Sequence, residues 1–191
     1  MHMNMFSKQN GVGLVEVMVA LLLLAVAVLG FSALNMVSVK ATDDSVLIAN
    51  ANTVMRGLSE DLRLNPNNII VYQQDIQSVL GKVSTSKTYC AAVQEYRAGS
   101  VTKNCDNESC TAEQLSKYNS WNAMRQACDN SVLLNMVTCP NTSDKQLRQC
   151  IITSWNGTQP VLGASSDSSK ACADTSGIYH AGSDCLIMES Y

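Results

Sequence analysis

The sequence predicts an α+β fold, in which one long N-terminal helix packs on a small antiparallel sheet in a disulfide-rich head. Two features of the 191-residue chain lead to this prediction. The 31 positions between Lys8 and Lys40 contain a single charged residue, Glu16, whereas all eight cysteines lie after residue 89. The front of the chain therefore has the composition of a membrane helix, and the rest has that of a polar domain held by disulfides.

The composition excludes several classes of protein. A hydrophobic content of 46% is too high for a disordered chain, and three prolines with ten glycines exclude a collagen-like repeat. The net charge of −3 and the isoelectric point of about 5.3 argue against a protein that binds nucleic acid mainly by electrostatics, because such proteins carry a basic stripe. Direct nucleic-acid binding is therefore not expected.

Residues 12–34 form an apolar segment that is interrupted only by Glu16, Ser32 and small glycines. At about 1.5 Å per residue, a helix of this length crosses the ~30 Å hydrocarbon core of a bilayer. The segment is longer than the core of an ordinary signal peptide, and no small-residue cleavage site follows it. Glu16 is informative, because an ionised carboxylate in an apolar helix costs roughly a few kcal/mol unless it finds water or a partner. A plain single-pass anchor, with Glu16 near the headgroups, is the alternative.

The same helix is expected to continue beyond the apolar segment. Steps of four and three residues define a stripe on one helical face, with Asp44 as its one break: Val37, Ala41, Asp44, Ile48, Ala51, Met55, Leu58 and Leu62. Four polar residues fall outside this stripe: Ser45, Asn52, Ser59 and Arg63. Pro66 cannot continue the helix, and it biases Asn65 toward extended backbone. The pattern predicts one helix over about residues 12–64, with its second half against the head.

Two shorter helices are expected in the head. Residues 68–80 carry regularly spaced apolar side chains and are followed by Gly81, which suits a helix with a glycine stop. Thr111 and Gln114 form a capping-box signature for a helix that ends near Cys128. Its inward-facing side chains would be Leu115, Tyr118 and Met124.

Three strands are expected after these helices. Short apolar runs bounded by turn residues predict strands at residues 132–139, 149–155 and 184–189. Residues 156–158 suit a turn, and the Ser/Asp-rich residues 163–170 suit an exposed loop. A long helix followed by strands is typical of an α+β protein.

The cysteines are even in number and fall in the last 102 residues: Cys90, Cys105, Cys110, Cys128, Cys139, Cys150, Cys172 and Cys185. Behind a membrane-targeting segment, they predict four disulfides formed in an oxidising compartment. No metal site is expected, because no C-x-x-C spacing occurs and His180 is the only histidine after His2. Free or mixed thiols are the alternative. Spacing does not choose among the possible pairings, although Cys105–Cys110 suits a short loop.

No catalytic site and no cofactor site is expected, so the chain is not predicted to be an enzyme. His180, Ser183 and Asp184 are too close in sequence to adopt the geometry of a catalytic triad. No glycine-rich phosphate loop of the G-x-x-x-x-G-K type is present. Four basic residues cluster loosely and are interpreted as scattered surface charge rather than as a site for an anionic polymer: Lys82, Lys87, Arg97 and Lys103.

Residues 11–22, GVGLVEVMVALL, resemble the prepilin-type (class III) signal of type IV pilins and pseudopilins. The resemblance implies cleavage by prepilin peptidase between Gly11 and Val12, and methylation of the new amino group. The family usually has Phe where this chain has Val12. Glu16 becomes the fifth residue of the mature chain, where the family keeps a glutamate. There its carboxylate could pair with the amino group of its own or a neighbouring subunit.

Three stretches narrow the resemblance to minor pilins of the type IV pilus modification protein (PilV) family, and they cover about a third of the chain. They are residues 15–31, residues 55–66, which close on Asn-Pro, and residues 110–121, with a Cys-Thr…Leu…Tyr…Trp pattern. This resemblance implies the pilin-like form of the α+β fold. It also implies a C-terminal loop bounded by a Cys172–Cys185 disulfide.

The resemblance implies a structural subunit, a minor pilin that primes or caps type IV pilus assembly and so supports twitching motility, adhesion or DNA uptake. It divides the chain into a leader (1–11), an apolar assembly half-helix (12–34), an amphipathic half-helix (35–65) and a periplasmic head (66–191). The implied partners are other minor and major pilins, prepilin peptidase, inner-membrane lipid before assembly, and a tip adhesin. The chain would cross the inner membrane once and then enter the surface pilus. A minor pseudopilin of type II secretion and a membrane-anchored periplasmic enzyme or binding domain are the alternatives.

Overall fold

The structure, a computed structural model, describes residues 13–83, 86–142, 148–164 and 170–190. It contains a long N-terminal helix, a small antiparallel sheet and four disulfides, which confirms the predicted α+β class. The chain forms two compact units, Met1–Asp44 and Ser45–Tyr191, and the first helix contributes to both.

Helix α1 spans Leu14–Leu64, close to the predicted range. It ends where the sequence requires, because Asn65 leaves the helical conformation with φ −135° immediately before Pro66. The side-chain amide of Asn65 then donates to the carbonyl oxygen of Ala112 at 2.9 Å and to Ser116 Oγ at 2.8 Å. These bonds hold the end of α1 against the start of a later helix.

The part of α1 in the second unit buries six side chains: Ala51, Val54, Met55, Leu58, Ser59 and Leu62. Four of them belong to the predicted stripe, but Ile48, also in that stripe, is 43% exposed. Ser59 lies outside the predicted stripe but is also buried, since it is only 8% exposed and its Oγ lies 2.9 Å from Ser190 Oγ. The buried face is wider than one stripe because the head's helices and its sheet both cover α1.

The predicted helices of the head are present and are joined by one that was not predicted. After η1 (Pro66–Asn68) come α2 (Ile69–Leu80) and, later, α4 (Ala112–Asp129). Thr111 Oγ1 accepts from the Gln114 backbone N–H at 3.2 Å and Gln114 Oε1 from the Thr111 N–H at 3.0 Å, which confirms the capping box. Gly81 follows α2 as expected, but its φ of −63° is right-handed, so glycine's special freedom is not used there.

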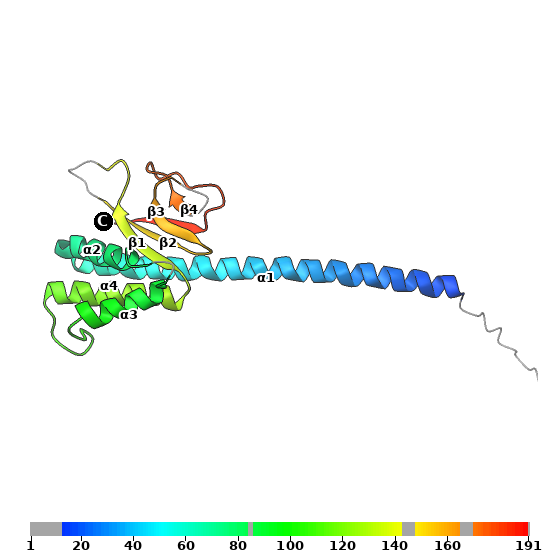
Figure 1. Cartoon of the computed structure of the whole chain (residues 1–191), viewed down its shortest axis with the longest axis horizontal. Helices are drawn as coiled ribbons and strands as arrows, with labels where there is room; N and C mark the ends of the chain where they lie inside the picture. The colour runs from blue at the N-terminus through cyan, green and yellow to red at the C-terminus, as the bar shows by residue number, and fades with distance from the viewer. Residues whose placement is uncertain (1–12, 84–85, 143–147, 165–169, 191) are drawn as a thin grey trace, which may run out of the picture. The chain divides into compact units, whose positions relative to one another are not determined.

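Helix α3 (Tyr89–Ser100) lies outside every predicted element. A signal for it exists, since Thr88 Oγ1 accepts from the Ala91 N–H as an N-cap. Its buried residues have the spacing of one helical face: Tyr89, Ala92, Val93 and Tyr96. Helices α2 and α3 both contact α4, and they form one layer of the head (Figure 1).

The three predicted strands form one antiparallel sheet in the order β1-β2-β5, with bounds β1 (Leu133–Thr138), β2 (Gln149–Ser154) and β5 (Cys185–Ser190). A second, unpredicted sheet pairs β3 (Thr158–Leu162) in parallel with β4 (Lys170–Ala173). The predicted turn at 156–158 leads into β3, with Asn156 at φ 50° and Gly157 at φ 81°. Of the predicted loop at 163–170, residues 165–169 lie outside the described part, and Lys170 begins β4.

The sheet β1-β2-β5 has two buried faces, because neighbouring residues of β2 point to opposite sides. Ile151 packs into the large cluster formed with the helices, whereas Ile152 packs with the Cys172–Cys185 disulfide, which joins the second sheet to β5. The head is thus layered as helices, three-stranded sheet and two-stranded sheet (Figure 1). This arrangement leaves β1 and β5 as the edge strands.

Candidate functional site

The N-terminal apolar segment is entirely helical from Leu14 onward, and its one charge lies in the first turn. Glu16 donates its backbone N–H to the carbonyl oxygen of Gly13 at 2.9 Å, and its side chain is exposed. Gly11 and Val12, the residues between which cleavage is predicted, lie outside the described residues. The cleavage site therefore stays a prediction, whereas the helix that would follow it is present.

The large apolar side chains of this segment are exposed to solvent all around the helix. Leu14 is 76% exposed and Leu34 is 72% exposed. Ser32 donates its hydroxyl to the Val28 carbonyl at 2.9 Å, so its polar group is satisfied within the helix. Among the described residues, α1 is the one helix long and apolar enough to cross a membrane. Such a surface requires lipid or other apolar helices around it.

The eight cysteines form four disulfides, and no free cysteine is present in the described residues. Cys90–Cys128 joins α3 to α4, and Cys139–Cys150 joins the residue after β1 to β2. Cys172–Cys185 joins β4 to β5, and Cys105–Cys110 closes a short loop before α4. The last two pairs are those that the resemblance and the short spacing favoured. The four disulfides therefore cross-link the helices, both sheets and one loop of the head.

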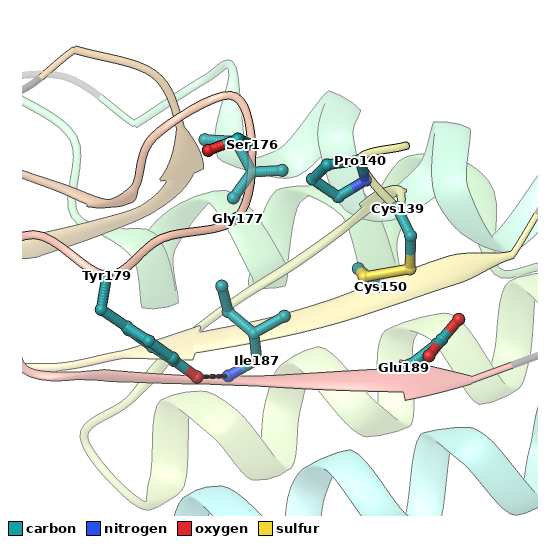
Figure 2. Close-up of a pocket in the computed structure, with 9 residues that line it drawn as sticks. Cys139, Pro140, Cys150, Ser176, Gly177, Tyr179, Ile187 and Glu189 are labelled. Atoms are coloured by element: carbon teal, nitrogen blue, oxygen red, sulfur yellow. Dashed lines mark hydrogen bonds between the residues drawn. A yellow bond between two sulfur atoms is a disulfide. The ribbon is translucent and has the colours of Figure 1, made fainter. Parts of the chain in front are cut away.

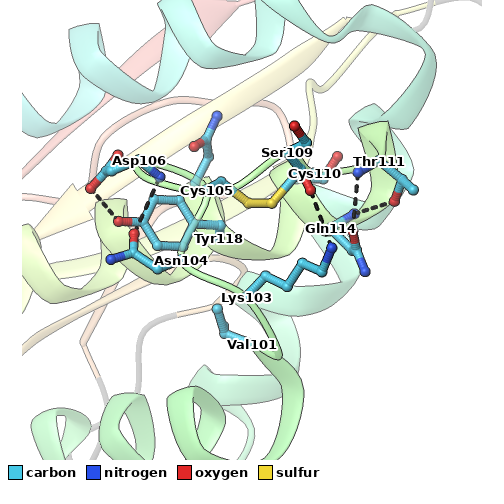
Figure 3. Close-up of a disulfide and its surroundings, with 12 residues drawn as sticks. Val101, Lys103, Asn104, Cys105, Asp106, Ser109, Cys110, Thr111, Gln114 and Tyr118 are labelled. Carbon is cyan, nitrogen blue, oxygen red and sulfur yellow. Dashed lines mark hydrogen bonds between the residues drawn. A yellow bond between two sulfur atoms is a disulfide. The ribbon is translucent and has the colours of Figure 1, made fainter.

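The loop around Cys105–Cys110 is further fixed by polar contacts (Figure 3). The hydroxyl of Tyr118 donates to Asp106 Oδ2 at 2.5 Å, and this hydrogen bond raises the pKa of Tyr118. Lys103 Nζ donates to the Ser109 carbonyl at 3.2 Å. Tyr118 is buried, as predicted, and holds the loop against α4.

The residues that could be drawn as a triad are not arranged as one. Ser183 Oγ lies 2.9 Å from the His180 backbone carbonyl and 3.0 Å from the Cys172 carbonyl, rather than bonding to the imidazole. The imidazole Nε2 instead lies 2.7 Å from the Gly163 carbonyl oxygen. In the described part of the chain, no three metal-ligating side chains gather into a group.

The loose basic cluster is engaged in local contacts. Lys82 and Lys87 both bond to Glu95, and the hydrogen bonds from these two lysines lower the pKa of that carboxyl. The Arg97 guanidinium donates to the Val101 carbonyl at 2.5 Å and lies 5.0 Å from the centre of the Trp121 ring. These cations therefore stabilise loops and helices and do not converge on an anion site.

Two features were not predicted. Arg125 also lies over the Trp121 ring, at 5.5 Å, so two guanidinium groups flank one indole. Burial raises the pKa of Asp61 from 3.8 to about 6. The sequence could have indicated this raised pKa, because Asp61 lies between Leu58 and Leu62. Both leucines are buried, and they place the carboxyl of Asp61 at the edge of the core.

Two family models match the chain. The model described as the prokaryotic N-terminal methylation motif matches residues 6–32, and the model described as type IV pilin Tt1218 matches residues 33–121. They adjoin, and together they cover more than half of the chain. The first includes Glu16, and the second runs from Ala33, within α1, to Trp121 in α4. No curated protein and no solved structure matches the chain.

Proposed function

Because this chain belongs to the type IV pilins, we propose that it is a minor pilin that enters the type IV pilus and helps to prime or cap its assembly. Type IV pilins are structural subunits that interact with other pilins. The observation that carries the proposal is Glu16, the one charged residue in the first turn of an exposed apolar helix, within the matched methylation motif. The resemblance of three stretches to the PilV family supports the minor role.

Assembly would follow from the chemistry of the segment. Once the leader 1–11 is removed, Val12 carries the new amino group, four residues before Glu16 in the sequence, a separation of about one helical turn in an α-helix. When exposed apolar helices pack together, an unpaired charge between them costs several kcal/mol, so pairing of the two groups selects one register. The apolar half-helix 12–34 then supplies the packing surface that lipid covered before assembly.

The remaining parts of the chain have separate roles in this proposal. The segment 35–65 carries the helix into the head, and the head 66–191 contacts other minor pilins, major pilins or a tip adhesin. Disulfides form in oxidising compartments, which supports a head in the periplasm and a single membrane crossing by α1. Twitching motility, adhesion or DNA uptake would depend on the chain through the pilus.

Substitution of Glu16 tests the proposal. Glu16→Ala should leave the protein processed and in the membrane fraction, but reduce its amount in sheared pili by roughly tenfold or more, because the neighbouring amino group loses its partner. Immunoblots of both fractions measure this ratio. Glu60→Ala is the matched control, since Glu60 is an exposed carboxylate on the same helix that pairs only with exposed Arg63.

Two outcomes would overturn the proposal. Unchanged incorporation of the Glu16→Ala chain would mean that α1 serves only as an anchor. A deletion strain that loses protein secretion but keeps its pili would identify the chain as a secretion pseudopilin.

A further inference from the structure

The outer edge of β5 carries main-chain groups that the sheet does not use. The Trp155 N–H donates to the Asp184 carbonyl at 2.9 Å, so these two residues occupy a hydrogen-bonded position just beyond the β2–β5 ladder, although the Asp184 N–H donates to Thr158 Oγ1 instead. Hydrogen-bonded and non-hydrogen-bonded pairs alternate in an antiparallel ladder. Ile187 and Glu189 therefore belong to non-hydrogen-bonded pairs, and their N–H and C=O groups point away from β2.

The opposite edge of the sheet, on β1, is closed by side-chain hydrogen bonds to both main-chain groups of its middle residue. Met136 is the outward-pointing residue at its middle, and its N–H donates to Asn135 Oδ1 at 2.8 Å. The Met136 carbonyl accepts from Gln77 Nε2 at 2.9 Å. Asn135 is only 4% exposed, so its half of this protection is part of the core, whereas Gln77 is exposed. Edge strands left without such protection are open to pairing with another chain.

The edge of β5 is covered by one exposed side chain. The Ile187 N–H donates to the Tyr179 hydroxyl at 2.9 Å (Figure 2). Tyr179 is 48% exposed and comes from the loop between β4 and β5. Within the described residues, the Glu189 N–H has no acceptor. A half-exposed ring can turn away at little cost, and the β5 edge is then open to another strand.

A pocket of about 330 Å³ lies beside this edge, on the face of the sheet that packs against β3 and β4 (Figure 2). Its apolar lining includes Pro140, Leu162, Ile187 and the Cys139–Cys150 disulfide. Tyr179 forms one side of the pocket. An extended chain that pairs with β5 would place one side chain over Ile187, where the pocket can accept an apolar group.

The carboxylate of Glu189, next to the pocket, favours a particular residue at a second position of the bound segment. Glu189 lies two residues after Ile187, so both side chains share one face of β5. The Glu189 side chain is 50% exposed, and Oε1 accepts from Arg148 Nη1 at 2.7 Å. No described residue donates to its second oxygen, so a lysine or arginine two positions from the apolar residue complements this site.

We propose that the outer edge of β5 binds an extended segment of a partner protein by strand addition, with Tyr179 covering the edge in the free chain. The segment carries an apolar residue for the pocket and, two positions away, a basic residue for Glu189. Main-chain hydrogen bonds give such complexes their affinity, and side-chain pockets give them their specificity. The proposal goes beyond the minor-pilin assignment and does not depend on it, since the edge lies in the head.

The test uses the full mature chain in detergent micelles and fluorescent peptides of sequence Thr-Thr-Val-Thr-Lys-Thr-Thr, with the reversed sequence for the opposite strand direction. Fluorescence anisotropy measures binding. Tyr179→Phe keeps the ring but frees the Ile187 N–H, and should tighten binding by roughly two- to tenfold. Thiol titration checks that each variant keeps its disulfides.

Two further experiments distinguish strand addition from nonspecific binding: methylation of the peptide's backbone amides, and reversal of the charge at position 189. Methylation of one alternate set of peptide amides should abolish binding, whereas methylation of the other set should not, because only one set faces β5. The Glu189→Lys variant should no longer bind the peptide that contains Lys, and should instead bind the peptide in which Glu replaces that Lys. The proposal is overturned if both methylated peptides bind alike, if Glu189→Lys leaves the preference unchanged, or if no peptide binds Tyr179→Phe at millimolar concentration.

Discussion

Asp61 lies half-buried on α1 between two buried leucines, and burial raises the pKa of its carboxyl from 3.8 to about 6. The raised pKa means that folding favours the protonated form. The resulting stabilisation is complete below about pH 4 and is lost as the pH rises through about 6. At neutral pH the ionised carboxylate is therefore a cost that the head carries.

Asp61→Asn should raise the free energy of unfolding at pH 7.5 by about 1 kcal/mol, a value reduced from that of the full pKa shift because the side chain is partly exposed. The gain should be smaller at pH 5, where the native carboxyl is already mostly protonated. Urea unfolding followed by circular dichroism at both pH values measures the difference.

Asp174→Asn is the matched control for this experiment. Asp174 is exposed, and hydrogen bonds led by the Ser176 hydroxyl lower the pKa of its carboxyl. Its stabilising effect is lost only as the pH falls below about 4, so this substitution should act equally at pH 7.5 and pH 5. A gain from Asp61→Asn that is the same at both pH values would show that charge burial is not its cause.

Individual residues could be predicted where a single position breaks the composition around it. Glu16 is such a residue, because no other charge lies near it, and the cysteines are another case, because their number is even. The Ser59–Ser190 contact and the Tyr179–Ile187 bond could not be predicted. Each depends on a partner strand whose register the sequence does not specify.

At the scale of elements, α1 combines two surfaces that need different surroundings. The residues up to Asp44 expose apolar side chains, whereas Met55 is 2% exposed in the core of the head. Met55→Lys should therefore destabilise the head by about 3 kcal/mol or more, because it buries an unpaired charge. Membrane insertion should be unchanged, since the apolar segment is intact.

Thr53→Lys provides the control for Met55→Lys. Thr53 is exposed on the same helix, two residues away, and its hydroxyl bonds only to the Ala49 carbonyl. Urea unfolding measures the head, and resistance to alkaline extraction measures insertion. Equal loss of insertion and stability in Met55→Lys would contradict the division of α1 into two functional surfaces.

The elements with a strong local signal were the ones that could be predicted. Helix α4 starts at a capping box, α1 ends before Pro66, and β1, β2 and β5 are apolar runs between turns. Helix α3 was missed because its sequence has no run of large aliphatic residues, although Thr88 marks its start. The pair β3–β4 is short and parallel, and its existence depends on packing against the larger sheet.

At the scale of the whole molecule, a disulfide that encloses more residues should contribute more to the free energy of unfolding. Cys90–Cys128 spans 38 residues, and Cys105–Cys110 spans 5. The loop-entropy model gives about 4 kcal/mol for the first and about 2 kcal/mol for the second. Replacing each pair by serines and measuring urea unfolding should therefore show the larger loss for Cys90–Cys128. Equal losses, or the reverse order, would show that the small loop has a larger structural role.

The two units of the chain also require different surroundings during the life of the protein. The apolar unit needs lipid or neighbouring helices, and the head needs an oxidising compartment for its disulfides. A pilin that is held in the inner membrane and then enters a filament meets both requirements. Removal of the leader is the step that joins the two stages in this proposal.

The mass of the mature chain, purified from its native membrane and measured intact, tests the proposed processing most directly. The expected chain begins at Val12, carries a methyl group on its amino terminus and keeps the whole of α1. Its mass should also show all cysteines oxidised. A chain that retains residues 1–11, or one that begins after residue 34, would contradict assembly through Glu16 and the apolar helix.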